Sequence, residues 1–317
     1  MTETLVGLAD IQAAAERIRG LIVRTPLVSV PPGTAPAMSV KCENLQPMGA
    51  FKMRGACNFL ARLTPEARAC GVITYSSGNH GQAVAMAAQR LGLPCVVVMP
   101  ETAPRVKVDG VRRYGGEVMF AGTTSIDRQA RAEAEAAARG LTIVPPFDHP
   151  WIIAGAGTCG LEILEQCPEV TAVYAPVSGG GLLSGVSTAI KALRPGVRTI
   201  GVEPSGAPKI TASRAAGRPV RLEKTASIAD GLLALRPGTI TFAHIQAFVD
   251  DVVTVEEDEI ADAVRWLFTN GGIVAEPSGA ASVAAVLKSG AMPGPRTVAV
   301  ISGGNVSPDD HARYIGR

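Results

Sequence analysis

The sequence predicts an α/β fold with two open, mostly parallel sheets, arranged as two domains with a cleft between them. Short apolar strand patterns alternate with helix patterns along the 317 residues, and this alternation favours parallel sheets with right-handed crossovers. Glycine and alanine are plentiful while aromatic residues make up only 4%, which is typical of tightly packed helices and sheets. A proline-rich stretch at residues 145–150 interrupts the pattern, and we expect the chain to cross between the two domains there.

The individual elements follow from apolar runs bounded by turn residues and from helices with polar starts and glycine ends. Asp10 is expected to cap a first helix at residues 11–19, which Gly20 ends. Further helices are expected at residues 51–62, 80–91, 104–114, 125–139, 157–167, 182–193, 257–269 and 277–288. Strands are expected at residues 38–42, 71–75, 95–99, 117–121, 141–144, 172–177, 199–202, 251–255 and 297–301.

The composition excludes several classes of partner. The net charge is only +2 and both signs are mixed along the chain, so neither a nucleic acid nor a membrane is an expected partner. The N-terminus lacks a signal-peptide pattern, and no apolar run is long enough to span a bilayer.

The cysteines form no Cys-x-x-Cys pair and most lie in apolar runs, which predicts buried, reduced thiols in a cytoplasmic protein. The four histidines show no metal-binding spacing, so no metal site is expected from them.

Lys52 has an unusual position, because it falls in the first turn of the helix expected at residues 51–62. The positive end of the helix dipole lies there and disfavours a cation, so the pKa of Lys52 is expected to be lowered. A neutral amine is the nucleophile that forms a Schiff base with a carbonyl group. From position alone, a solvated surface lysine is the more common alternative.

A glycine-rich turn, Ser178-Gly179-Gly180-Gly181-Leu182, follows an expected strand and opens an expected helix. Successive glycines let backbone N–H groups converge on an anion, and the helix N-terminus adds its positive dipole. The spacing is not Gly-x-Gly-x-x-Gly and lacks the Lys-Ser/Thr of a nucleotide P-loop, so the phosphate bound here need not belong to a nucleotide. The alternative is a tight turn that serves packing only.

Two more turns of small residues, at 76–81 and 302–305, also follow expected strands. In open α/β sheets, ligands bind at the carboxyl ends of the strands. The first turn offers two hydroxyls, an amide and an imidazole beside free backbone N–H groups, which suits a carboxylate. Taken alone, however, this turn is more simply a helix N-cap, and Ser302 is more simply a cap or turn residue.

Together these motifs resemble the fold-type II pyridoxal-phosphate enzymes, which have a tryptophan synthase β-like fold, and within them the threonine dehydratase and serine racemase branch. The resemblance covers nearly the whole chain and rests on residues 41–46, 51–56, 76–81, 178–182, 202–205, 228–231, 276–279 and 302–305. Related sulfhydrylases and synthases carry threonine in the turn where this chain has Asn79 and His80. The resemblance implies a large cofactor-binding domain of residues 1–70 and 149–317, a small domain of residues 71–148, an active-site cleft between them, and a homodimer.

The resemblance also implies a role for each motif. Lys52 would bind pyridoxal 5'-phosphate as a Schiff base and, once freed by the substrate, take its Cα proton. The turn at residues 178–182 would cradle the cofactor phosphate with Ser178, Gly179, Gly180, Gly181 and Leu182. The other implied cofactor contacts are Phe51 against the ring, Asn79 at the ring 3-oxygen and Ser302 at the pyridine nitrogen. The substrate carboxylate would be bound by Ser76, Asn79 and His80.

The implied reaction is β-elimination from a small 3-hydroxy amino acid, such as L-threonine or L-serine, to a 2-keto acid and ammonia. Ser77 would lie across the substrate from Lys52. An acid and a base on opposite faces also permit racemisation, so a serine racemase with dehydratase side activity is the nearest alternative. An alternative of another class is a non-catalytic protein that binds a phosphate ligand, although the intact Phe51-Lys52 motif beside an intact Ser77 argues against it.

The chain departs from the family pattern at two positions. Ala50 stands where the family usually has serine before the Phe-Lys motif. Glu203 and Ala207 match two ligands of the family's divalent-cation site, but Lys209 stands where the third ligand is an aspartate. Because an ammonium group cannot ligate a cation and would repel one, we expect no metal at this site, with Lys209 neutralising Glu203 instead.

Overall fold

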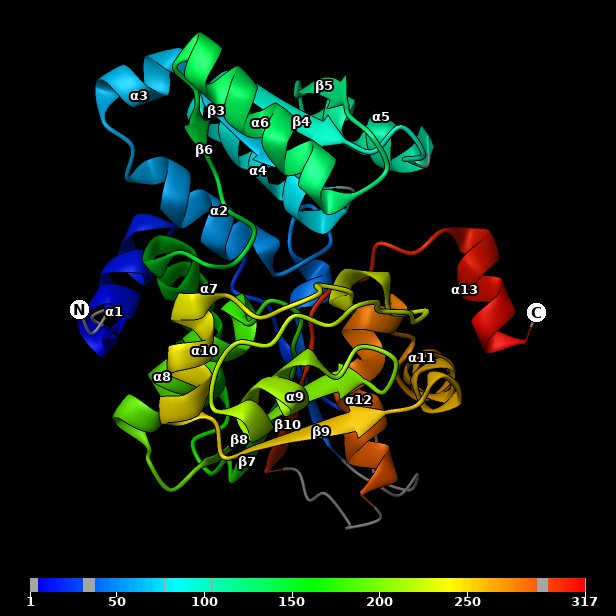
Figure 1. Ribbon diagram of the computed structural model, residues 1–317. Coiled ribbons are helices and arrows are strands. Elements are labelled where there is room, and N and C mark those ends of the chain that lie inside the picture. Colours follow the sequence, from blue (N-terminus) through cyan, green and yellow to red (C-terminus); the bar gives the residue numbers. More distant parts are fainter. Residues whose placement is uncertain (1–4, 31–37, 77, 104, 290–295, 317) are drawn as a thin grey trace.

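The protein is built on two separate sheets, as Figure 1 shows. The structure is a computed structural model that describes residues 5–30, 38–76, 78–103, 105–289 and 296–316. One sheet has six strands in the order β1-β2-β10-β7-β8-β9, and the other has four in the order β5-β4-β3-β6. All strand pairs are parallel except β1 with β2. The predicted fold class is therefore confirmed.

The elements have the following bounds. The strands are β1 Leu27–Ser29, β2 Ser39–Cys42, β3 Val72–Tyr75, β4 Cys95–Met99, β5 Glu117–Phe120, β6 Thr142–Ile143, β7 Ala172–Pro176, β8 Arg198–Pro204, β9 Asp251–Val255 and β10 Thr297–Ile301. The helices are α1 Leu8–Arg17, α2 Lys52–Ala61, α3 Pro65–Cys70, α4 Asn79–Leu91, α5 Arg105–Arg113, α6 Ser125–Arg139, α7 Pro150–Gln166, α8 Gly181–Leu193, α9 Lys209–Ala216, α10 Thr239–Phe248, α11 Glu257–Gly271, α12 Pro277–Lys288 and α13 Pro308–Ile315. Two short 3₁₀ helices are η1 Glu43–Leu45 and η2 Asp230–Leu232.

Two predicted helix starts were wrong by more than one residue, and both errors concern the N-terminal end of the helix. Asp10 does not precede α1 but is its third residue, and its carboxylate accepts the N–H of Gly7. The helix predicted at residues 157–167 begins seven residues earlier, because Pro150 opens α7, where the fixed φ of proline suits the first turn. His149 caps this start, since its Nδ1 accepts the N–H of Trp151. Residues 77 and 104, both within predicted features, lie outside the described residues.

Seven elements were not predicted: β1, α3, α9, α10, α13 and the 3₁₀ helices η1 and η2. They are short or rich in β-branched residues, so the periodic signal in each is weak. The prediction that the cysteines are buried holds for five of them, but Cys70 is exposed. This cysteine ends α3, a surface helix with no buried residue.

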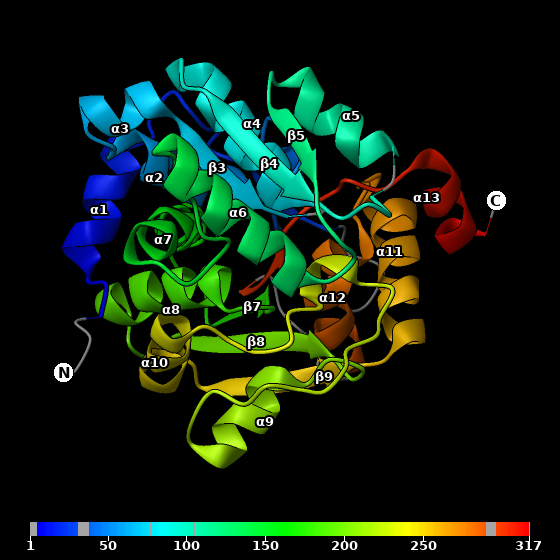
Figure 2. The ribbon, with the colours of Figure 1, turned by 45° about the horizontal axis from the view of Figure 1, so that its top comes forward.

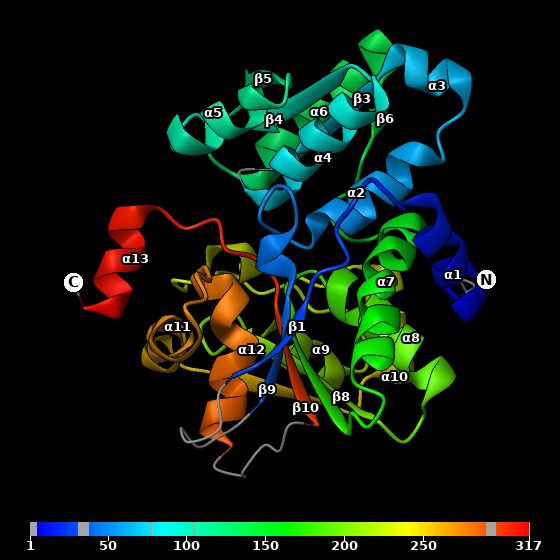
Figure 3. The same ribbon diagram turned by 180° about the vertical axis from the view of Figure 1, so that it is seen from behind.

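Helices cover both faces of each sheet (Figures 2 and 3). In the four-stranded sheet, α4 and α6 lie on opposite faces. In the six-stranded sheet, α12 packs on one face and α8 on the other, with α7 against α8. Helix α2 lies between the two sheets and packs on both α4 and α7. Within the described part of the chain, no helix combines the length and the apolar character needed to cross a membrane.

Candidate active site

A cleft of about 720 Å³ is lined mainly by loops and helices that flank the two sheets. The strands β3, β7 and β10 end at it, because the turns that follow each of them contribute to its wall. An ion pair bridges α5 and η2 at this cleft, with Lys107 Nζ 2.6 Å from Asp230 Oδ2. The described residues predicted for the site all line this cleft: Phe51, Lys52, Ser76, Asn79, His80, Ser178, Gly179, Gly180, Gly181, Leu182 and Ser302. Ser77 lies outside the described residues.

Lys52 is the first residue of α2, as the sequence predicted. Its Nζ donates a hydrogen bond to the carbonyl oxygen of Pro146 at 2.6 Å and lies 5.2 Å from the centroid of the Phe51 ring. Burial lowers the pKa of Lys52 to about 8. The predicted direction is therefore confirmed, but desolvation is the cause, where the sequence analysis invoked the helix dipole. A neutral amine is thus accessible near neutral pH.

The glycine loop, residues 178–182, connects β7 to α8. Gly180 adopts φ +110°, a conformation that favours glycine. A Cβ on Gly179 would lie 2.4 Å from the Phe147 ring, and one on Gly180 would lie 2.7 Å from Cβ of Thr241. The loop is therefore too tightly enclosed for larger residues. The N-cap of α8 is Gly180, which brings no side-chain acceptor, so the first-turn N–H groups suit an anion.

The turn at residues 76–81 is tied to the six-stranded sheet through Asn79, the first residue of α4. Its amide Nδ2 donates to Glu276 Oε1 at 2.7 Å, and its Oδ1 accepts from Asn305 Nδ2 at 2.8 Å. His80 is buried, with Nε2 3.1 Å from the carbonyl oxygen of Val144. Burial and the nearby Lys52 lower the pKa of His80 to about 3, so its ring is neutral at pH 7.

Ser302 follows β10 and is buried beside the start of α2. Its hydroxyl donates to the carbonyl oxygen of Ser278 at 3.4 Å, and its own carbonyl accepts the N–H of Phe51 at 3.0 Å. A bridge between Ala50 and Gly303 extends this contact. The last strand and the Phe51-Lys52 pair therefore reach the cleft as one packed unit.

Glu276 lies in the cleft wall. It belongs to the motif at residues 276–279, for which the sequence predicted no role. It is 6% exposed and accepts the amide of Asn79. Burial, followed by the negative charge of Asp230, raises the pKa of Glu276 to about 7. A carboxyl group whose pKa lies so close to neutral pH is typical of functional sites.

Glu276→Gln is expected to remove a pH dependence of stability. Because the pKa of Glu276 rises from 4.5 to about 7 on folding, the folded protein binds more protons than the unfolded chain in that window. Stability therefore falls as pH rises through it, by roughly 3 kcal/mol in all. Urea unfolding at several pH values between about 5 and about 7 measures this decline. The same decline in the Gln variant would contradict the assignment.

The chain is similar in sequence to known proteins over most of its length. Residues 18–303 match the family described as pyridoxal-phosphate dependent enzyme. The chain belongs to this family. It is 41% identical to L-threonine ammonia-lyase from Thermotoga maritima over 99% of this chain and 79% of that protein. It is also 41% identical to serine racemase from Arabidopsis thaliana, over 94% of this chain and 93% of that protein.

Solved structures agree with the sequence relatives of this pyridoxal-phosphate-dependent enzyme. Maize serine racemase superposes with a TM-score of 0.91 at 36% identity, covering 96% of this chain and 95% of that chain. The processed form of threonine deaminase isoform 2 from Solanum lycopersicum superposes with a TM-score of 0.92 at 34% identity, covering 100% of this chain and 96% of that chain. Both names fit the branch that the sequence motifs resemble.

The cleft residues fit a pyridoxal-phosphate cofactor. Lys52 offers an amine whose pKa is lowered to about 8, as a Schiff base requires. The glycine loop opens α8 without a side-chain cap, so the N–H groups of the first turn are left to hold a phosphate. Both groups line the same cleft of the enzyme.

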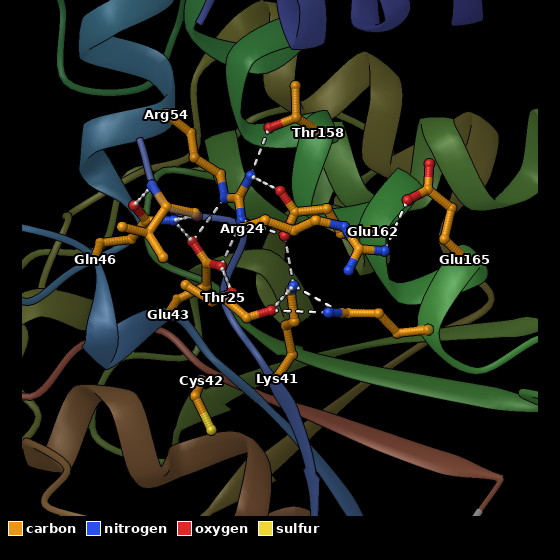
Figure 4. Close-up of polar contacts among 12 residues, drawn as sticks. Arg24, Thr25, Lys41, Cys42, Glu43, Gln46, Arg54, Thr158, Glu162 and Glu165 are labelled. Atoms are coloured by element: carbon orange, nitrogen blue, oxygen red, sulfur yellow. Dashed lines mark hydrogen bonds and ion pairs between the residues drawn. The ribbon is translucent and has the colours of Figure 1, made fainter. Parts of the chain in front are cut away.

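A buried ion network fixes the helix that carries Lys52 (Figure 4). The network consists of Lys41, Glu43, Arg54 and Glu162, which come from β2, η1, α2 and α7. Arg54 donates to Glu43 through Nε and Nη2 at 2.7 Å each, and to Glu162 through Nη1 and Nη2 at 2.7 and 2.8 Å. Its last N–H goes to Thr158 at 2.9 Å, so all five donors are used.

The other charges of the network are also satisfied. The ammonium of Lys41 donates to Glu162, to the carbonyl oxygen of Thr25 and to Gln166. Although burial alone would raise it, Arg54 holds the pKa of Glu43 below its ordinary value. Two cations balance two carboxylates, so the network carries no net charge. Sequence reasoning missed it, although a lysine inside a buried strand always needs a partner.

Lys209 lies beside Glu203 in the enzyme, and both side chains are fully buried. Its Nζ lies 3.5 Å from Glu203 Oε2 and donates to the carbonyl oxygens of Ala207 and Leu232 at 2.9 Å each. Burial lowers the pKa of Lys209 to about 8, against the opposing effect of Glu203. The ammonium is therefore charged at pH 7 and is surrounded by oxygen atoms.

Proposed function

We propose that this enzyme catalyses β-elimination from a small 3-hydroxy amino acid, such as L-threonine or L-serine, to a 2-keto acid and ammonia. The observation that carries the proposal is the convergence of Lys52 and the glycine loop in one cleft. Relatives named L-threonine ammonia-lyase, similar over nearly the whole chain, support this reaction. The nearest alternative is a serine racemase with dehydratase side activity, which relatives of that name support.

When bound, pyridoxal phosphate supplies an electron sink for the pair left behind at Cα. Lys52 takes the Cα proton, for which its lowered pKa suits it. The Cβ–O bond then breaks, and the hydroxyl leaves as water together with the proton taken from Cα. Water later replaces the nitrogen, so one amino acid gives one keto acid and one ammonia.

The remaining roles are assigned to the predicted residues. Phe51 would pack against the cofactor ring, Asn79 would donate to the ring 3-oxygen, and Ser302 would face the pyridine nitrogen. A hydroxyl there does not hold that nitrogen protonated, which weakens the electron sink and favours prompt loss of the β-hydroxyl. The substrate carboxylate is bound by Ser76, Asn79 and His80. Since the His80 ring is neutral and bonded to Val144, we assign this role to its backbone N–H.

Ser77→Ala is expected to separate elimination from racemisation. A hydroxyl on the face opposite Lys52 delivers a proton only for racemisation, so formation of D-serine should fall by about 100-fold or more. Keto-acid formation from L-serine should fall far less. Both products can be measured from one incubation by chiral chromatography and a keto-acid assay. An equal loss of the two activities would mean that Ser77 serves binding or geometry.

Chelators are expected to leave the activity unchanged, because the Lys209 ammonium takes the place of a divalent cation beside Glu203. The measurement compares turnover before and after exhaustive treatment with EDTA, and again after Mg²⁺ or Ca²⁺ is added back. Activity that collapses in the chelator and returns with either ion would contradict this assignment. Lys209→Met should destabilise the protein, because it leaves the buried Glu203 without its cation. The control is Lys224→Met at an exposed lysine, which should leave the stability unchanged.

The division of the chain is part of the proposal. Residues 1–70 and 149–317 form a large cofactor-binding domain around the six-stranded sheet, and residues 71–148 form a small domain around the four-stranded sheet. We further propose a homodimer located in the cytoplasm. Analytical ultracentrifugation tests the dimer directly.

The reaction itself is tested by following keto acid and ammonia with purified enzyme and a panel of amino acids. L-Threonine or L-serine should release both products in equal amounts. A bulkier or acidic hydroxy amino acid that reacts faster would redefine the substrate. Conversion of L-serine to D-serine as the main reaction would favour the racemase alternative.

A further inference from the structure

We propose that Asp148 is a positioning residue that holds the glycine loop in the shape that binds the cofactor phosphate. The inference rests on the proposed function, in which this loop cradles the phosphate. Asp148 belongs neither to the loop nor to the motifs of the sequence analysis. It lies between β6 and α7, in the segment where the chain returns to the six-stranded sheet.

Asp148 caps α10 from a distant part of the chain. Helix α10 begins after Gly238, which has no side chain with which to cap it. The carboxylate of Asp148 accepts the N–H groups of Thr239, Ile240 and Thr241 at 2.8, 2.9 and 3.1 Å. A Cβ on Gly238 would lie 2.2 Å from the Asp148 carboxylate. The contact is therefore close enough to require glycine at that position.

The capped end of α10 holds the glycine loop through one atom. The carbonyl oxygen of Gly179 accepts the hydroxyl of Thr241 at 2.6 Å and the N–H of Gly238 at 3.1 Å. In a trans peptide the C=O and the following N–H point in opposite directions. Fixing the Gly179 carbonyl to α10 therefore turns the N–H of Gly180 away from α10. Since this loop lines the cleft, that orientation suits a phosphate.

The same segment holds the loop from its other side and contacts Lys52. Phe147 precedes Asp148, and its ring lies so close to Gly179 that a Cβ there would meet it at 2.4 Å. Pro146, one residue earlier, accepts the hydrogen bond from Lys52 Nζ. Three consecutive residues thus contact the amine, the glycine loop and the helix that anchors the loop. Of these three residues, Asp148 is the one that contacts the anchoring helix α10.

The test compares binding of pyridoxal 5'-phosphate and of pyridoxal, which lacks the phosphate, to the protein freed of cofactor. Asp148→Ala should weaken binding of pyridoxal 5'-phosphate by about tenfold, the scale expected for loss of a helix cap, and leave pyridoxal binding unchanged. Asp148→Asn keeps a hydrogen-bond acceptor, so its affinity for pyridoxal 5'-phosphate should lie between those of the unmodified protein and Asp148→Ala. Thr241→Val removes the hydroxyl bond to Gly179 and should show the same selective loss. The double variant should bind pyridoxal 5'-phosphate little more weakly than Asp148→Ala alone, because both changes act through the carbonyl group of Gly179.

Thr124→Ala is the matched control. Thr124 caps α6 by accepting the N–H of Asp127 at 3.2 Å, and α6 does not contribute to the cleft wall, so neither ligand should bind differently. Equal weakening of both ligands in the Asp148 and Thr241 variants, or no weakening, would overturn the inference. If Asp148→Ala does not fold, Asp148→Asn and Thr241→Val decide the question. Failure of the unmodified protein to bind pyridoxal 5'-phosphate would overturn the proposed function instead.

Discussion

Replacing Lys52 by alanine is expected to abolish turnover and the yellow colour of the purified protein. In the proposed mechanism the side chain supplies both the amine that binds the cofactor and the base that takes the Cα proton, so its loss removes two contributions at once. General acid–base catalysis alone typically contributes about 10²- to 10⁴-fold. Keto-acid release and a visible absorption spectrum, recorded on the same sample, measure both effects.

The control for this variant is Lys224→Ala, which removes an exposed lysine. It should keep full colour and activity. Near-normal turnover in Lys52→Ala would show that another group forms the Schiff base.

The rate of cofactor binding is expected to depend on pH. Burial favours the neutral form of Lys52, so the cofactor should bind faster as pH rises through about 8.

Arg54→Met is expected to lower the free energy of unfolding by about 3–5 kcal/mol, as is usual when one partner of a buried ion pair is removed. The variant leaves the carboxylates of Glu43 and Glu162 with fewer donors in a dry environment. Urea denaturation monitored by circular dichroism measures the loss. The network joins α2 to α7, so the position of Lys52 at the start of α2 should also be less well defined. The folded molecules of the variant should therefore have a lower kcat.

Arg19→Met is the matched control, since Arg19 makes an exposed ion pair with Glu16. Such surface pairs contribute only about 0–1 kcal/mol. A loss in Arg54→Met no larger than in Arg19→Met would mean that the network contributes little to stability. A double variant, Arg54→Met with Glu43→Gln, should be less destabilised than the sum of the two single changes.

Much of the fold was predictable because the strands of parallel sheets are short, apolar and separated by clear helices. The strands at residues 95–99, 251–255 and 297–301 and the helices at residues 125–139 and 277–288 were predicted with the observed bounds. The missed helix α10 contains several β-branched residues and owes its start to Asp148, 91 residues away from Thr239. Such a cap exists only in the folded chain, so no local pattern reveals it.

The candidate site was predictable wherever a turn follows a strand. Lys52 and the glycine loop were singled out from their local context, whereas Asn79 and Ser302 gained a role only from the family resemblance. The structure brings all of them to one cleft. The missed contributions act across the sequence: Glu276 contacts Asn79 over 197 positions, and Glu162 contacts Arg54 over 108. The pairing of buried charges depends on the tertiary structure and cannot be read from spacing.

The most direct test of the proposed function is to reduce the purified protein with borohydride, digest it, and locate the pyridoxyl group by mass spectrometry. Reduction makes the bond between the cofactor and its lysine permanent, so the modified peptide identifies the amine. We expect a single pyridoxyl group on Lys52, in lower yield when borohydride is added during turnover of L-threonine or L-serine. A pyridoxyl group on another lysine, or none on any, would contradict the assignment of Lys52 as the cofactor-binding residue.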